Sequence, residues 1–399
     1  MGWDAVLKRM QDLRVLIPAS RLPLTWSTSL LLLPPQILAS IHAFLNIRHA
    51  PRWVHLVLLP LTVLVTVWCH ASVYFDQPGF NIYNQIFGVS AFLILVRVLD
   101  WSLVPLRPRA QSQRHPTTPR TLLTDWGDTI SALCDLRGVV HTFGQRCHFR
   151  SYPSETRAAF LADRAKSLLF NFLTLDCLRT LVRFFGPLGT PEGRSIFLPH
   201  LSPLPRFALS LFLTLSIGGA IFSYIATLHC LLSLLLVGLF QQDPNRWPPM
   251  FDRPWLASSL ADFWARRWHQ LFRRQFVVCS WPGRAGGGDT GAVLTAFLGS
   301  GVLHEAGMRC MGRGGATWQT VGFFLLQGLG CAAEHVFTSL SGRKVRGPMG
   351  RVWTWAWLLL WGQALADAFA VRGTAGGTLY PEWMSPSEQV LNGFGVYTR

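Results

Sequence analysis

Long apolar runs recur along most of this chain, and each is bounded by charged, glycine or proline residues. A helix that crosses a bilayer needs about 20 mostly apolar residues. We therefore expect an all-α fold, a polytopic transmembrane helical bundle that forms one membrane-embedded domain over residues 1–399. The pattern predicts about eight spans, near residues 22–46, 53–75, 82–104, 167–187, 206–240, 291–312, 317–340 and 349–371.

The run at residues 206–240 decides the topology, because it is long for one crossing and short for two with a turn. Its Gly218 and Gly219 could kink a helix. If the run crosses once, the basic loops at residues 105–166 and 242–290 share one side of the membrane. Basic loops stay cytoplasmic during insertion, so we place both loops in the cytoplasm and both termini in the lumen.

The segments between the spans differ in character. Residues 1–21 form a short amphipathic lead without the compact apolar core of a removed signal peptide. The aromatic residues of the two long loops predict short helices that lie at the membrane interface. Residues 105–120, rich in Pro, Arg, Gln and Ser, are instead typical of a flexible linker. Residues 291–371 hold the C-terminal spans.

Composition favours a membrane protein over a soluble one. Hydrophobic residues make up 50% of the chain and charged residues 14%, with a mean hydropathy of +0.29. A soluble domain has about a quarter charged residues. The net charge of +16 does not indicate nucleic-acid binding, because Lys and Arg occur in short clusters between apolar runs. The eight cysteines form no CxxC pair, so we interpret them as small core residues.

The densest polar segment, residues 263–276, lies just before a predicted span. Its spacing predicts a helix with a cluster of guanidinium groups, which match the geometry of phosphate. The alternative is an interfacial belt, in which arginine and tryptophan only anchor the protein in the membrane. The candidate site residues of this segment are Arg266, Arg267, Trp268, His269, Gln270, Arg273 and Arg274.

A second candidate lies inside a later apolar run, where Gly299-Ser300-Gly301 precedes His304 and Glu305. Ionisable groups are costly in the hydrocarbon region, so they often mark function. The small residues would let another helix or a thin substrate approach the backbone beside His304. A histidine that only hydrogen-bonds between two helices is the alternative interpretation.

A metal site is a further alternative, since His304 and Glu305 could gather with Glu334 and His335 of the next apolar run. The sequence contains no HExxH, HxxxH or HxxHH motif, so the spacing gives no regular face of ligands. We therefore predict no metal.

Two segments contain a series of short motifs, which are Pro249-Met250-Phe251, Pro254, Ser258-Ser259-Leu260, Phe263-Trp264, Arg267-Trp268-His269-Gln270 and Ser300-Gly301-Val302-Leu303-His304-Glu305. In their order and spacing these motifs resemble the wax-synthase-like branch of the membrane-bound O-acyltransferases. The rest of the chain resembles this branch only in its pattern of apolar runs.

The resemblance implies an enzyme that moves an acyl group from acyl-CoA, a co-substrate and not a bound cofactor, to an alcohol. It implies that His304 occupies the catalytic position and that His269 occupies the polar position of the second motif. Fungal members often acetylate hydroxylated terpenoids or meroterpenoids in secondary-metabolite biosynthesis. By this analogy we expect acetyl-CoA as donor, a lipophilic terpenoid alcohol as acceptor, and the endoplasmic reticulum as location.

On this hypothesis His304 is a general base, because the pKa of imidazole lies near operating pH. His269, Gln270 or Ser300 would donate hydrogen bonds to the oxyanion that forms. The arginines would bind the phosphates of coenzyme A. Trp268 and Glu305 complete the predicted substrate-binding set.

Three other functions stay open. A long-chain wax-ester or sterol-ester synthase would use the same residues with a longer acyl groove. A membrane transporter would use His304, Glu305, Glu334 and His335 as an ion pathway, but transporters commonly show internal repeats, and none is visible. An idle scaffold would leave the cost of intramembrane His and Glu unexplained.

Overall fold

The computed structural model describes residues 20–104, 121–141, 156–312 and 314–394. Helices dominate these residues, and the only strands among them are β1 (Leu22–Pro23) and β2 (Val73–Tyr74), which pair in parallel. The prediction of an all-α fold is therefore confirmed. The predicted linker at 105–120 and nearly all of the predicted lead at 1–21 lie outside the described residues.

The described residues divide into two compact units, each assembled from separate stretches of chain. The first unit contains residues 20–77, 83–141 with its gap, and 272–315. The second contains residues 78–82, 156–271 and 316–394. One membrane-embedded domain over residues 1–399 stays a prediction.

In the first unit, α3 packs on α4 and α6, and α10 packs on α11. Prolines in the first turn of α3 have the backbone angle that a helix start requires. A small apolar core joins Ala43 of α3 with Val98 and Trp101 of α5 and Ala132 of α6. The helices of this unit are α2 (Trp26–Ser29), η2 (Leu30–Leu32), α3 (Leu33–Ile47), α4 (Arg52–Ser72), α5 (Asn81–Leu103), α6 (Leu122–Cys134), α10 (Arg273–Cys279) and α11 (Trp281–Cys310).

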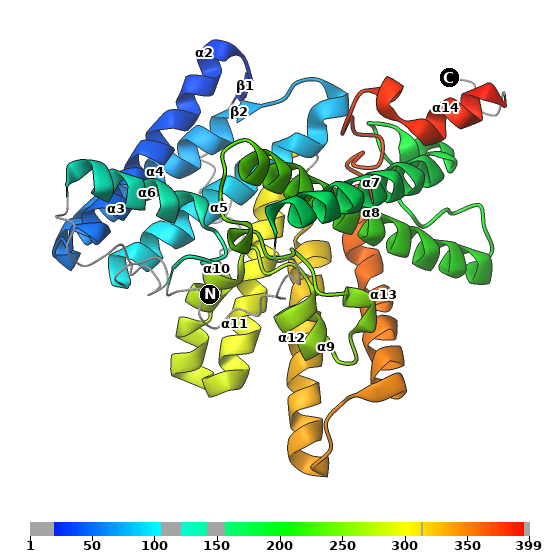
Figure 1. Ribbon diagram of the computed structural model, residues 1–399. Coiled ribbons are helices and arrows are strands. Elements are labelled where there is room, and N and C mark those ends of the chain that lie inside the picture. The colour runs from blue at the N-terminus through cyan, green and yellow to red at the C-terminus, as the bar shows by residue number, and fades with distance from the viewer. Residues whose placement is uncertain (1–19, 105–120, 142–155, 313, 395–399) are drawn as a thin grey trace. The chain divides into compact units, whose positions relative to one another are not determined.

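Helix α11 is a hairpin of two helices (yellow in Figure 1). Gly287 and Gly288 depart from helical angles, and Gly288 has φ 59° and ψ −143°, a conformation that essentially only glycine adopts. A side chain on Gly283 would overlap the carbonyl of Gly291, so the two arms lie in close contact. The last part of the predicted loop at 242–290 is therefore helical and pairs with the predicted span that follows it.

In the second unit, α7 and α8 lie side by side (green in Figure 1), and α12 packs on α13 (orange). Gly342, with φ 67°, ends α12 in the left-handed conformation that favours glycine. The helices of this unit are η3 (Pro78–Phe80), α7 (Arg157–Arg183), η6 (Gly186–Gly189), α8 (Pro203–Gly238), η7 (Pro244–Arg246), η8 (Pro254–Leu256), α9 (Leu260–Asp262), η9 (Phe263–Arg267), α12 (Thr317–Ser341), α13 (Gly347–Ala370), η10 (Glu382–Met384) and α14 (Pro386–Gly393).

Five helical segments are long and apolar enough to cross a membrane: Trp26–Ile47, Arg52–Ser72, Pro78–Leu103, Pro203–Gly238 and Thr317–Ser341. They correspond to five of the predicted spans. The other three predicted runs are also helical, in α7, α11 and α13, but none meets the same criterion. Helix α7 carries several charged residues, α11 is rich in glycine and α13 in tryptophan. The predicted count of eight spans is therefore not confirmed.

Helix α8 settles how the run at 206–240 folds. It is one helix of 36 residues, and it continues through Gly218 and Gly219. At 1.5 Å per residue a helix of this length rises about 54 Å, whereas the hydrocarbon core is about 30 Å thick. The run therefore forms a single helix, and it does not turn back on itself within 206–240.

Helix α6 lies in the predicted loop at 105–166. It buries polar side chains and exposes apolar ones. Asp125 and Thr129 are fully buried, while Leu123 is 82% exposed and Trp126 is 44% exposed. Arg48, which directly follows α3, forms an ion pair with Asp125, with 2.9 Å between Arg48 Nη1 and Asp125 Oδ2. An outward apolar face fits a helix at the membrane interface, and that location stays a prediction.

Candidate functional site

The segment with the cluster of arginines does not form one helix. Helix α9 continues into η9, a π-helical turn in which the Trp268 N–H donates to the Phe263 carbonyl at 2.8 Å. Trp268 is then extended, with φ −71° and ψ 159°, and helix α10 begins only at Arg273. The prediction of a continuous helix over 263–276 was therefore wrong.

Gln270 explains why the chain leaves the helix there. Its side chain is 3% exposed, and its Nε2 donates to the carbonyls of Trp264 at 3.3 Å and of Trp268 at 2.9 Å. These carbonyls lie where the helix would otherwise continue, so the amide satisfies acceptors that the broken helix leaves open. Gln270 thus stabilises the turn that presents His269.

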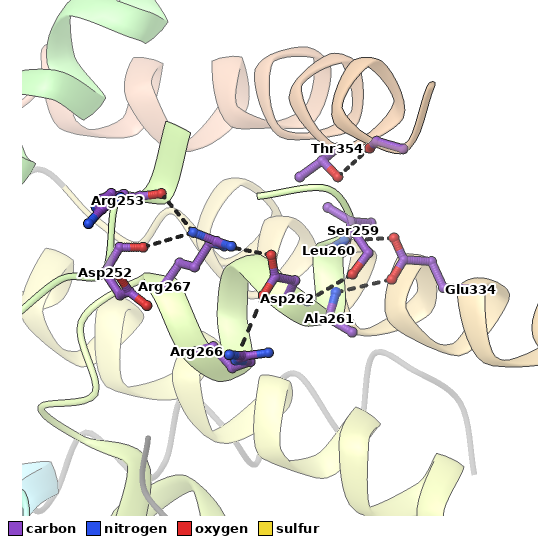
Figure 2. A network of polar contacts seen from close by, with 11 residues as sticks. Asp252, Arg253, Ser259, Leu260, Ala261, Asp262, Arg266, Arg267, Glu334 and Thr354 are labelled. Atoms are coloured by element: carbon purple, nitrogen blue, oxygen red, sulfur yellow. Dashed lines mark hydrogen bonds and ion pairs between the residues drawn. The ribbon is translucent and has the colours of Figure 1, made fainter. Parts of the chain in front are cut away.

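Glu334 of α12 holds the start of this segment (Figure 2). Its Oε1 accepts from the Leu260 N–H at 2.6 Å and its Oε2 from the Ala261 N–H at 3.1 Å. The indole of Trp353 donates to Oε1 at 2.9 Å. A carboxylate at a helix N-terminus satisfies unpaired backbone donors and interacts well with the helix dipole. Glu334 therefore fixes α9 to α12.

Arg267 is held on the other side of the same turn (Figure 2). Its Nε lies 2.5 Å from Asp262 Oδ2, and its Nη1 donates to the carbonyls of Asp252 at 3.2 Å and Arg253 at 3.3 Å. The neighbouring Arg266 makes a longer contact, with 3.9 Å between its Nε and Asp262 Oδ1, and its side chain is 58% exposed. Arg267 therefore stabilises the turn, whereas the guanidinium of Arg266 is open to a ligand.

His269 lies among aromatic rings. Its ring centroid is 5.9 Å from that of Phe251 and 5.6 Å from that of Trp268. Trp268 also stacks on Phe263 at 5.3 Å. Such rings restrict the imidazole to few orientations, because a rotated ring would collide with them. Phe251 thus lies beside His269, and Phe263 supports the ring of Trp268, which also lies beside His269.

His304 lies in the second arm of the α11 hairpin, within the first unit. Ser300 is four residues earlier, so both face the same side of the helix. Glu305 forms an ion pair with Arg309, with 2.8 Å between Oε1 and Nε. Glu305, which was predicted to bind substrate, therefore has a cationic partner one turn further along the same helix.

Two glycines set the packing around the helix of His304. The position of a Cβ on Gly299 would be 2.7 Å from Cys279 Cβ, so α10 packs directly on this glycine. A Cβ on Gly88 of α5 would overlap the carbonyl of Ala306. The prediction that small residues admit a neighbouring helix near His304 is met at Gly299.

Arg274 of α10 is bound to Asp100 of α5 in the first unit. Its Nε donates to Oδ2 at 2.8 Å and its Nη2 to Oδ1 at 2.5 Å, a bidentate geometry. The guanidinium also lies 5.6 Å from the centroid of the Trp281 ring. Arg274 and Arg267 are therefore both neutralised by carboxylates, whereas the exposed Arg266 keeps its guanidinium accessible to a phosphate.

The two candidate segments fall in different units. Ser300, His304 and Glu305 belong to the first unit with Arg273 and Arg274, whereas residues 266–270 belong to the second. A joint site of His304 and His269 stays a prediction.

The metal alternative gains no support from the carboxylates that it would need. Glu334 accepts backbone and indole hydrogen bonds, and Glu305 is paired with Arg309. Among the described residues, no group of three or more His, Cys, Asp or Glu side chains gathers in a way that could hold a metal ion.

Sequence reasoning missed Asp100 and Asp262. Asp262 precedes Arg266 by four residues, a spacing that favours ion pairs on one helix face, so it could have been found. Asp100 lies 174 residues from Arg274 along the chain, and no local pattern points to it. Glu334 was noted as an intramembrane charge, but its binding of the α9 amides was not foreseen.

Comparison with known proteins places these segments in a family. The sequence profile of the membrane bound O-acyl transferase family matches residues 247–326, which include both His269 and His304. The acetyltransferase ataH of Aspergillus terreus is 31% identical over 244 residues, which are 53% of this chain and 78% of ataH.

Two further relatives differ in their acyl groups. The acetyltransferase aurG of Calcarisporium arbuscula is 28% identical over 275 residues, 63% of this chain and 66% of aurG. The long-chain-alcohol O-fatty-acyltransferase of Simmondsia chinensis is 37% identical over 110 residues, 25% of this chain and 30% of that enzyme. About a third of aurG and most of the plant enzyme thus lie outside the match.

Proposed function

This chain belongs to the membrane-bound O-acyltransferase family, and from this premise we propose that it transfers an acetyl group from acetyl-CoA to a hydroxyl of a lipophilic alcohol. The match across residues 247–326, which contain both candidate histidines, carries the proposal. The similarity to the acetyltransferases aurG and ataH supports acetyl as the acyl group. A terpenoid or meroterpenoid acceptor and an endoplasmic reticulum location are part of the same proposal.

In the proposed mechanism His304 is the general base. Its imidazole takes the proton of the acceptor hydroxyl while the oxygen forms a bond to the thioester carbonyl carbon. The carbon–sulfur bond then breaks, and the proton passes from His304 to the leaving thiolate of coenzyme A. The apolar helix around His304 supports this role, because it would keep water from competing with the alcohol.

Donors to the oxyanion would come from His269 and Ser300. Gln270, the third candidate, already donates its amide to Trp264 and Trp268, so we assign it a positioning role. Ser300 lies one turn before His304, which suits a hydroxyl that acts on the same substrate.

Arg266 and Arg273 would bind the phosphates of coenzyme A. Arg266 supports this assignment by its exposed side chain and its long 3.9 Å separation from Asp262. Arg267 and Arg274 would act indirectly, since their carboxylate partners fix the backbone that carries the other two.

A second candidate function is long-chain ester synthesis, favoured by the identity of 37% with the plant long-chain-alcohol enzyme over 110 residues. Membranes from cells that express this chain would receive acetyl-CoA or palmitoyl-CoA with hydroxylated terpenoids, fatty alcohols and sterols. We expect acetyl esters of terpenoids. Palmitoyl esters of fatty alcohols would favour the second candidate, and no ester with any pair, at good expression, would contradict both.

A further inference from the structure

Three buried N–H donors in the second unit have no hydrogen-bond acceptor in the described part of the chain. They are the amide Nε2 of Gln327 on α12 and the indole Nε1 atoms of Trp357 and Trp361 on α13. Helices α12 and α13 pack against each other (Figure 1). A buried donor without an acceptor loses its hydration and gains nothing in return, so such groups are rare and need an explanation.

The orientation of the Gln327 amide follows from its neighbour. Trp264 Nε1 lies 3.4 Å from the Gln327 side-chain oxygen, and an indole N–H can only donate. The atom that faces Trp264 must therefore be Oε1, which directs the NH₂ group elsewhere. Gln327 is 0% exposed, so this NH₂ group points into the interior of the protein.

Trp357 packs against the helix that carries Gln327, and Trp361 follows it on α13. Trp357 Nε1 lies 2.9 Å from the position that a Cβ on Gly330 would occupy, and Gly330 is three residues from Gln327 on the same face of α12. The rings of Trp357 and Trp361 are 5.9 Å apart between centroids. Trp357 thus lies against α12 near Gln327, and Trp361 lies one turn from Trp357 on α13.

Trp353 provides an internal comparison. It lies one turn before Trp357 on α13, and its indole donates to Glu334 at 2.9 Å. The same residue type on the same helix therefore finds an acceptor where the protein supplies one. At Trp357 and Trp361 the described residues supply donors and no acceptor, so a ligand that binds there must bring oxygen atoms.

We propose that Gln327, Trp357 and Trp361 form a subsite that binds a carbonyl, ether or second hydroxyl oxygen of the acceptor alcohol. This inference rests on the proposed function. The reacting hydroxyl needs a base that accepts its proton, so a site made only of donors suits a different oxygen of the same molecule. The indole rings would pack on the apolar part of that molecule. The subsite thus selects oxygenated alcohols over simple fatty alcohols.

The test compares two acceptors that differ in one oxygen: stearyl alcohol and the same alcohol with a second, mid-chain hydroxyl. We expect the native enzyme to have the lower KM for the diol. Trp357→Phe and Trp361→Phe should each raise the diol KM about five- to tenfold, the effect of one lost hydrogen bond, and leave the stearyl alcohol KM within about twofold. The matched control Trp353→Phe should lower thermal stability without changing this preference.

Binding without turnover separates this inference from the proposed function. The thermal midpoint of the full chain in detergent should rise more with the diol than with stearyl alcohol, and Trp357→Phe should remove the difference. This result would uphold the subsite even if no ester formed. Equal shifts for both alcohols in the native chain, or variants that gain stability with an unchanged preference, would mean that the donors bind water only and would overturn the proposal.

Discussion

The carboxylates of Glu334 and Asp262 both contact the segment that precedes His269, and each is bound by groups of the protein itself. Glu334 accepts backbone N–H groups at the start of α9, and Asp262 binds Arg267 at its end. Hydrogen bonds to a charged group are stronger than those between neutral groups. The turn should therefore depend on both carboxylates.

Glu334→Gln should destabilise the protein. The amide keeps one acceptor oxygen but directs an NH₂ group toward an N–H of Leu260 or Ala261. We expect the free energy of unfolding to fall by about 1.5–3 kcal/mol, the range for a hydrogen bond to a charged group. Thermal unfolding in detergent measures it. His335→Gln, at the exposed neighbouring position, is the control, and equal midpoints for the two variants would disprove the role of Glu334.

Adjacent arginines should give opposite phenotypes. Arg267→Lys loses the planar fork that bridges Asp262 and the carbonyls of residues 252 and 253, so abundance and thermal midpoint should fall. Arg266→Lys should leave stability unchanged, and Arg266→Ala should raise the KM for acyl-CoA about fivefold or more. Acyl-CoA titrations of the purified variants test this. A stable Arg267→Lys variant with a raised KM would reverse the two assignments.

At the scale of elements, the crossing of α5 and α11 lies two residues from His304. Gly88→Ala would place a methyl group on the Ala306 carbonyl and force the helices apart. Activity should fall at least tenfold, because small displacements of catalytic groups are costly. Ester formation per unit of protein is the measurement.

Gly218→Ala in α8 is the matched control for Gly88→Ala. Nothing lies within 4 Å of a Cβ at Gly218, so the substitution should be neutral or add up to about 1 kcal/mol through helix propensity. Native activity in the Gly88→Ala variant would show that the crossing does not position His304.

The helices were predictable because apolar runs of about 20 residues are visible in any single stretch of sequence. The break after Arg267 was not, since it depends on a π-helical turn and on the Gln270 amide binding two carbonyls. The pair of Asp100 and Arg274 was equally hidden by distance along the chain. The candidate residues could thus be identified from sequence, whereas the ion pairs that hold Arg267 and Arg274 could be found only from the geometry.

At the scale of the whole molecule, the charge distribution predicts which loops face the cytoplasm. The connection between α12 and α13 contains Arg343, Lys344 and Arg346 and should be cytoplasmic, whereas the segment around Glu382 should be lumenal. A glycosylation acceptor sequence introduced at Glu382 should be modified, and one introduced at Arg343 should not. Gel mobility before and after glycosidase treatment measures this, and the reverse pattern would invert the topology.

The proposed chemistry joins a polar donor from the cytosol with an acceptor that dissolves in the bilayer. An imidazole in an apolar helix, with arginines in the preceding segment, suits that combination.

The central claim is that His304 carries out acyl transfer. Native chain and His304→Ala would be compared at equal abundance in membranes, with acetyl-CoA and a hydroxylated terpenoid, by the amount of ester and of free coenzyme A formed. The account predicts ester and coenzyme A in equal amounts from the native chain and a loss of at least about a thousandfold in the variant, within the contribution expected of a general base. Ester formation by His304→Ala at the native rate would contradict it.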